Sequence, residues 1–125
     1  MVRFDLIGLG NALVDSEFHV TDSFLKKKGF EKGTMHLVDS DEQTNLLNSL
    51  EKEYGKPSLA CGGSATNTIF AASILGSSCS YICKVGNDKN GNFYLDDLSD
   101  AGVNIDHSVM LDSNINSGTC TVMVS

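Results

Sequence analysis

Basic side chains are scarce in this sequence. Lysine and arginine together number 9, against 16 aspartate and glutamate residues, and the formal net charge is −7. A surface that binds the phosphate backbone of a nucleic acid needs clustered Lys and Arg, so the composition argues against DNA or RNA as a partner. The one basic run, Lys26–Lys28, is either a solvated face or a short patch that steers an anion.

Long apolar runs and metal-type cysteine spacing are also missing. No segment approaches the roughly 18 apolar residues of a membrane span, and the chain starts directly with a short apolar strand, so we expect neither a membrane partner nor a signal peptide. The four cysteines include no Cys-x-x-Cys pair, and the three histidines lie far from them in sequence. Zinc binding is therefore disfavoured, and buried free thiols in a reducing cytoplasm are the better interpretation.

The first apolar segment lacks the third glycine of a dinucleotide-binding loop. Gly8 and Gly10 supply two glycines, but Leu13 stands where the G-x-G-x-x-G pattern needs the third. No acidic residue follows at the expected strand end. A nucleotide-dependent oxidoreductase is therefore the weakest functional interpretation.

Strand and helix patterns alternate along the chain. Short apolar segments bounded by glycine or polar residues predict strands at 3–10, 17–20, 34–38, 59–61, 79–86, 107–112 and 118–125. Apolar stripes with capping residues predict helices at 40–54, 64–75 and within 87–102. Alternation of this kind favours an α/β fold with a layered sheet of parallel strands.

Three features qualify this pattern. Residues 64–75 carry small side chains on nearly every side and few charges, so we expect this helix to be buried. Segments 16–39 and 107–125 break the alternation and are expected to form a smaller β element. The sequence ends at Ser125 in the middle of an apolar strand pattern, so we expect the chain to be a piece of a longer domain.

Two polar residues follow the first strand. Asn11 stands near its end, and Asp15 comes four residues later. A carboxylate accepts hydrogen bonds from two neighbouring hydroxyls, and an amide both donates and accepts, so this pair suits a sugar-like polyol at the strand ends where α/β sheets bind ligands. The alternative is equally open: Asp15 caps a helix or turn, and Asn11 forms a turn.

A glycine pair precedes the helix at 64–75. Gly62 and Gly63 let the backbone approach another group closely, and N–H groups at the helix start are free to meet an oxygen. Asn67 lies in the first turn of this apolar helix and needs a partner, which is either a ligand or a backbone group. The glycine pair and Asn67 strengthen the polyol interpretation.

Four motifs occur in order and cover essentially the whole chain: GLGNALVD, CGGSATNTIFAASILG, KVGNDKNGNFYLDDLSDAGVN and SGTCTVMVS. Together they resemble the ribokinase-like (PfkB) carbohydrate kinases, and the first and last are most similar to the adenosine kinase branch. The resemblance implies a three-layer α/β/α sandwich with a small β-sheet lid. Residues 1–125 would form its N-terminal part, with lid segments at about 16–39 and 107–125.

The resemblance also implies an activity and a binding site. The activity is cytoplasmic, ATP-dependent phosphorylation of a hydroxymethyl group on a sugar or nucleoside. Asp15 would hold sugar hydroxyls with Asn11 beside it, and the glycine pair and Asn67 would complete the sugar site. The substrate-binding positions implied are Asn11, Asp15, Gly62, Gly63, Ser64, Asn67 and Cys120.

The catalytic half of the family has no counterpart in these residues. A Gly-Ala-Gly-Asp-type loop and the contacts to ATP and Mg²⁺ are absent, so we expect no catalytic or metal-binding residue in this chain and no turnover by the chain alone. The segment GNDKNG at 86–91 lacks Walker spacing and predicts a turn before a helix. A homodimer formed through the lid is compatible with the resemblance.

Two hypotheses from different classes follow. In the first, the chain is the substrate-binding half of a sugar or nucleoside kinase. In the second, it is a non-catalytic module that binds ribose or a nucleoside. Continuation of the reading frame past Ser125 would favour the first, and a stop codon there would favour the second.

Overall fold

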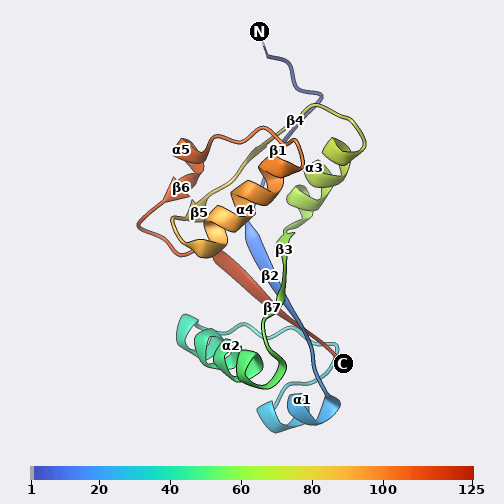
Figure 1. The fold of residues 1–125 in the computed structure, drawn as a ribbon, viewed down its shortest axis with the longest axis vertical. Coiled ribbons are helices and arrows are strands. Elements are labelled where there is room, and N and C mark those ends of the chain that lie inside the picture. The colour runs from blue at the N-terminus through green and yellow to red at the C-terminus, as the bar shows by residue number, and fades with distance from the viewer. Residues whose placement is uncertain (1) are drawn as a thin grey trace. The chain divides into compact units, whose positions relative to one another are not determined.

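The computed structural model describes residues 2–125 and has a mixed α/β architecture (Figure 1). The elements in chain order are β1 (Leu6–Leu9), β2 (Leu13–His19), α1 (Asp22–Lys28), α2 (Ser40–Tyr54), β3 (Ser58–Gly62), α3 (Ser64–Ile74), β4 (Cys79–Ile82), β5 (Val85–Gly86), α4 (Lys89–Asp100), α5 (His107–Met110), β6 (Leu111–Asp112) and β7 (Gly118–Val124). Within residues 2–125, none of the helices has the length and apolar character that a membrane crossing requires.

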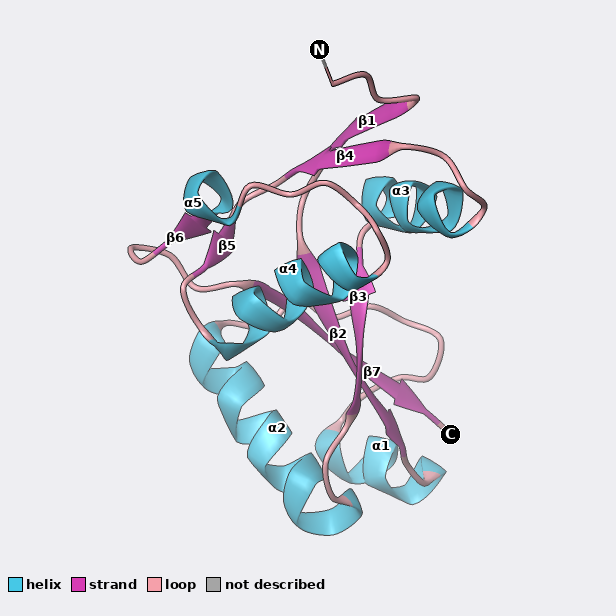
Figure 2. Cartoon of the chain, turned by 45° about the horizontal axis from the view of Figure 1, so that its top comes forward, coloured by secondary structure: helices cyan, strands magenta, loops and turns pink. Residues whose placement is uncertain are grey.

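The chain divides into two compact units, which are described separately. Unit 1 comprises the chain up to Asp15 together with Ala60–Cys120, and unit 2 comprises Ser16–Leu59 together with Thr121–Ser125. β1 pairs in parallel with β4, with Leu6 opposite Cys79, and β5 pairs in parallel with β6. β2 is the central strand of a sheet with the order β3-β2-β7 (Figure 2).

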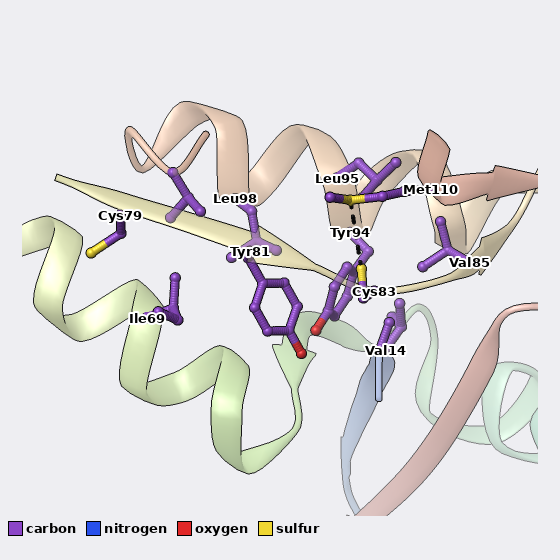
Figure 3. Packing of buried hydrophobic residues seen from close by; sticks show 12 residues of the cluster. Val14, Ile69, Cys79, Tyr81, Cys83, Val85, Tyr94, Leu95, Leu98 and Met110 are labelled. Atoms are coloured by element: carbon purple, nitrogen blue, oxygen red, sulfur yellow. Dashed lines mark hydrogen bonds between the residues drawn. The ribbon is translucent and has the colours of Figure 1, made fainter. Parts of the chain in front are cut away.

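The core of unit 1 is built from β4, α3 and α4 (Figure 3). Alternation along β4 buries Cys79 and Tyr81 and turns Ile82 outward. Ile69 of α3 is 1% exposed and packs in the same cluster. The fully buried contributions of α4 are Tyr94, Leu95 and Leu98.

α3 is covered on one side only, so the prediction of a buried helix is wrong. Its buried residues are Thr66 and Ile69, whereas Ile74 is 64% exposed. β1 and β4 pack on this helix, and Gly8 of β1 permits the close approach: a Cβ on Gly8 would lie 2.5 Å from Cγ1 of Ile69. The small side chains of α3 let β1 and β4 pack closely on one face. They do not ensure that other elements cover the remaining faces.

Asp88 begins α4 and ties it to the segment before β7. Its carboxylate accepts hydrogen bonds from the Gly91 N–H at 2.7 Å, the Ser117 N–H at 2.8 Å and the Ser117 hydroxyl at 2.7 Å. Burial of Asp88 opposes its ionisation, but the hydrogen bonds from Ser117 and Gly91 outweigh burial and lower its pKa. The segment at 86–91 is thus a capped helix start.

Unit 2 has a separate core around Leu50, which is fully buried. Phe18 and Val20 pack there with Phe24 of α1, whose ring meets that of Tyr54 edge-on at 5.4 Å between centroids. The predicted apolar stripe of α2 lies in this core. Its capping box begins at Asp39, one residue before the segment 40–54 that was predicted to be helical.

Two further predictions need correction. Residues 34–38 form no strand, and Leu37 is 92% exposed. Residues His107–Met110 form α5, so only Leu111–Asp112 of the predicted strand at 107–112 is extended. Residues 34–38 are exposed and belong to no strand, whereas at 107–110 the Asp106 carboxylate accepts from the Ser108 N–H at 3.0 Å and starts a helix.

The basic run Lys26–Lys28 is the last turn of α1. Positive charge is favourable there because it faces the negative end of the helix dipole. The Lys28 ammonium donates to the Ser49 hydroxyl at 3.0 Å and lies 5.8 Å from the centre of the Phe24 ring. All three lysines are exposed, as a solvated face requires, and Lys28 also links α1 to α2.

Candidate functional site

Asp15 of β2 and Gly62 of β3, both in unit 1, lie against each other on neighbouring strands. A Cβ on Gly62 would lie 2.6 Å from Oδ1 and 2.8 Å from Oδ2 of Asp15, so a side chain there would occupy the place of the carboxylate. Alternation along β2 buries Val14 and Ser16 and leaves Asp15 half-buried on the opposite face. Glycine at position 62 is therefore what makes room for the acid.

The Asp15 carboxylate has no hydrogen-bond donor among residues 2–125. Partial burial raises its pKa, and no hydrogen bond or cation in the described chain offsets that effect. The predicted alternative, in which Asp15 caps a helix or turn, is not what the side chain does. It is an acceptor available to a ligand.

Gly63 brings the backbone of Asn11 to the start of α3. Gly63 has φ of 107°, a conformation that favours glycine, and a Cβ there would lie only 2.7 Å from the Asn11 carbonyl oxygen. Asn11 itself lies between β1 and β2 and is exposed. The structure thus brings residues 11–15 and 62–63, far apart in sequence, into contact.

Ser64 and Asn67 occupy the first turn of α3. Both are exposed, so the interpretation of Asn67 as a polar group in an apolar setting is wrong. The Asn67 side-chain amide has no hydrogen-bond partner in the described chain, and its backbone N–H donates to the Gly63 carbonyl at 2.9 Å. Gly63 provides no side-chain cap, so the first N–H groups of α3 stay open.

Cys120 lies in β7 within electrostatic range of Asp15. Partial burial raises the pKa of the Cys120 thiol, and the negative charge of Asp15 raises it further. The residue is exposed, contrary to the expectation that the cysteines are buried. Both effects disfavour the thiolate form of Cys120.

A second thiol, Cys61, precedes Gly62 and is half-buried. Its pKa is raised by burial, by the hydrogen bond from its Sγ to Asp97 Oδ2 at 3.3 Å and by the charge on that carboxylate. This thiol also stays protonated near neutral pH. Asp97 lies in α4, so the contact fixes the end of β3 to that helix.

Comparison with known proteins identifies the family of this chain. The model of the pfkB family of carbohydrate kinases matches residues 34–125. The chain belongs to this family. The matched region contains the glycine pair, the first turn of α3 and β7.

The pfkB-family chain is similar to nucleoside and sugar kinases. It is 30% identical to adenosine kinase 2 of Arabidopsis thaliana over 122 residues, covering 95% of this chain and 34% of that protein. It is 40% identical to the ribokinase of Dictyostelium discoideum over 63 residues, covering 50% of this chain and 20% of that protein. The structure of Trypanosoma brucei brucei adenosine kinase matches with a TM-score of 0.82 and 25% identity, covering 100% of this chain and 38% of that one. The chain therefore spans about a third of the adenosine kinases that it matches.

Sequence analysis missed a set of buried hydroxyls beneath the glycine pair of this pfkB-family chain. Thr66, Tyr81 and Tyr94 are each fully buried. Thr66 hydrogen-bonds to both tyrosine hydroxyls, and the Tyr94 hydroxyl donates to the Gly62 carbonyl at 3.1 Å. The available signal was hydroxyl residues inside strongly apolar elements, since a buried hydroxyl needs a partner.

Metal ligands do not gather in the described part of the chain. Within residues 2–125, no group of three or more His, Cys, Asp or Glu side chains is arranged to hold a metal ion. Gly62 and Gly63 lie instead beside one acceptor carboxylate, that of Asp15, and the uncapped backbone N–H groups that start α3.

Proposed function

We propose that this chain carries the substrate-binding half of an ATP-dependent kinase that phosphorylates the hydroxymethyl group of adenosine or a related ribose-like compound. The observation that carries the proposal is the contact between the Asp15 carboxylate and Gly62, beside the glycine that starts α3. A carboxylate without a protein donor accepts hydrogen bonds from two neighbouring sugar hydroxyls. The open N–H groups of α3 donate to their oxygens.

The proposed substrate class follows from what the relatives share. Two of them are named for adenosine and for ribose, and ribose is the part common to both. Asn11, Ser64, Asn67 and Cys120 would line the site around Asp15. A ribose ring offers adjacent hydroxyls of the spacing that one carboxylate accepts.

The wider architecture is part of the same proposal. The chain would form the N-terminal part of a three-layer α/β/α sandwich, with a lid from about 16–39 and 107–125. Unit 2 overlaps these segments at 16–39 and 121–125 and also includes α2. ATP and Mg²⁺ would bind to residues outside this chain in a cytoplasmic enzyme, and the lid would be the surface through which two subunits could pair.

Removal of the Asp15 carboxylate tests the function. We expect Asp15→Ala in the full-length product of the gene to lower kcat/KM for adenosine or ribose roughly 10- to 150-fold, because losing a charge-assisted hydrogen bond costs about 1.5–3 kcal/mol. ADP release measures the rate. Glu17→Gln, an exposed acid two residues along the same strand, is the matched control and should keep normal turnover. Normal turnover in Asp15→Ala would reject the assignment.

A non-catalytic nucleoside-binding module is the second candidate. Every candidate binding residue lies within this chain, so binding can be tested apart from catalysis. Calorimetric titration of the gene product with adenosine separates the two. Binding that depends on Asp15 but is accompanied by no ADP release would select the module.

A further inference from the structure

We propose that the buried hydroxyls of Thr66, Tyr81 and Tyr94 form a positioning device that sets the geometry of the polyol site. The proposal rests on the proposed function. None of the three residues reaches the substrate; they act through the backbone of Gly62.

The three hydroxyls come from three elements of unit 1 and converge on one backbone carbonyl. Thr66 lies in α3, Tyr81 in β4 and Tyr94 in α4. Thr66 Oγ1 lies 2.8 Å from the Tyr81 hydroxyl and also hydrogen-bonds to the Tyr94 hydroxyl. Figure 3 shows the hydroxyls of both tyrosines pointing to the same side of the cluster.

Tyr94 is the donor that reaches the site. A carbonyl can only accept, so the Tyr94 hydroxyl is the donor in its 3.1 Å contact with the Gly62 oxygen. Burial raises the pKa of Tyr94, so this donor stays protonated at any physiological pH. Gly62 also lies against the Asp15 carboxylate, whose Oδ1 would be 2.6 Å from an added Cβ. The position of the Gly62 peptide therefore decides how much room the acid has.

The same hydroxyls also bound the other segment of the site. A Cβ on Gly10 would lie 2.7 Å from the Tyr81 hydroxyl, and Gly10 immediately precedes Asn11. A Cβ on Gly63 would lie 3.3 Å from Thr66 Oγ1 and 2.7 Å from the Asn11 carbonyl. The same buried network thus contacts Gly10 and Gly63. It therefore fixes the spacing between residues 10–15 and 62–63.

Apolar packing alone would not require the three buried hydroxyls. Burying three hydroxyls is unfavourable unless each finds a partner, and phenylalanine and valine would fill nearly the same volume. Here the three hydroxyls bond to one another, and the network ends at the backbone carbonyl of Gly62. A network of this kind fixes one arrangement of the elements that contribute to it.

The test compares variants that remove a hydroxyl with one that keeps it. We expect Tyr94→Phe and Thr66→Val in the full-length gene product to raise KM for adenosine about 10-fold with kcat nearly unchanged, since looser positioning weakens substrate and transition-state binding alike. Thr66→Ser retains the hydroxyl while deleting a buried methyl, and should keep KM within about twofold of wild type. Tyr54→Phe, which removes a tyrosine hydroxyl in unit 2 that contacts Thr21, is the matched control.

A second measurement needs no substrate. Amide hydrogen exchange at residues 62–65 should quicken in Tyr94→Phe and Thr66→Val but not in Thr66→Ser or Tyr54→Phe. Wild-type KM and exchange in the first two variants would overturn the proposal, as would equal effects of Thr66→Ser and Thr66→Val. If Tyr94→Phe does not fold, Tyr81→Phe gives the same comparison from the far end of the network. Failure of the wild-type protein to bind or phosphorylate adenosine or ribose would instead reject the proposed function, while the exchange pattern would still report on the network.

Discussion

Placing a methyl group on Gly62 is the most direct test of the site geometry. In Gly62→Ala the new Cβ would lie 2.6 Å from Asp15 Oδ1 and 2.9 Å from its Cγ. Close carbon–oxygen contacts stop at roughly 3.3 Å, so the carboxylate would have to move by about 0.7 Å. Displacement of a positioning group by about 1 Å can cost 100-fold in rate. We expect kcat/KM for adenosine to fall about 10- to 100-fold, measured by ADP release.

The fold should survive this substitution, because Gly62 is not among the glycines with positive φ. Gly33→Ala is the control, since it should change stability and not activity. Gly33 has φ of 80°, and a Cβ added there would meet no atom within 4 Å, so alanine strains the backbone by about 1–2 kcal/mol without touching the site. It should lower the melting temperature and leave kcat/KM unchanged. Wild-type activity in Gly62→Ala would refute the placement of Asp15 at the substrate.

Two further predictions concern stability. Asp88→Ala should lower the free energy of unfolding by about 1–3 kcal/mol in urea titrations of the full-length product, because it removes the cap of α4 and both links to Ser117. The folded-state pKa of Asp88 is lowered, so its stabilising effect is present above its unfolded pKa and is lost as pH falls through the folded value; Asp88→Asn should flatten this acid dependence, and an unaltered dependence would contradict the assignment. The 125-residue chain alone should unfold over a broad temperature range, because its small sheets bury little surface, and a sharp cooperative calorimetric peak would count against this.

Local signals predicted the parts of the fold that local forces determine. The apolar stripe and start of α2 could be predicted because a capping box and its helix lie within a few residues. The glycine pair Gly62–Gly63 correctly predicted a close approach of the backbone to another group, because few residues other than glycine permit one. The family assignment rests on the same kind of contiguous motif.

Features that depend on distant partners could not be predicted. The small side chains of α3 indicated burial, but exposure is set by what packs on each side, and Ile74 has little cover in the described chain. Residues 107–110 became helical because Asp106 caps them. The hydroxyl network joins residues 66, 81 and 94, and no spacing in the sequence predicts that these residues meet.

The roles of Asn11, Ser64 and Asn67 stay predictions for a physical reason. Their side chains are exposed, so neither packing nor protein hydrogen bonds fix where they point. Asp15 is better defined because Gly62 and burial confine it. Sequence motifs locate such residues, but contact with a ligand is needed to fix the orientation of their side chains.

The two-stranded pairing of β1 with β4 has a practical consequence. Among residues 2–125, β1 has β4 as its neighbour on one edge and no strand on the other, and Ile7 and Leu9 are 64% and 76% exposed. Unpaired backbone groups beside bare aliphatic side chains recruit strands from other molecules. We therefore expect concentrated solutions of this chain to form intermolecular sheet and precipitate, and Ile7→Lys to reduce that aggregation.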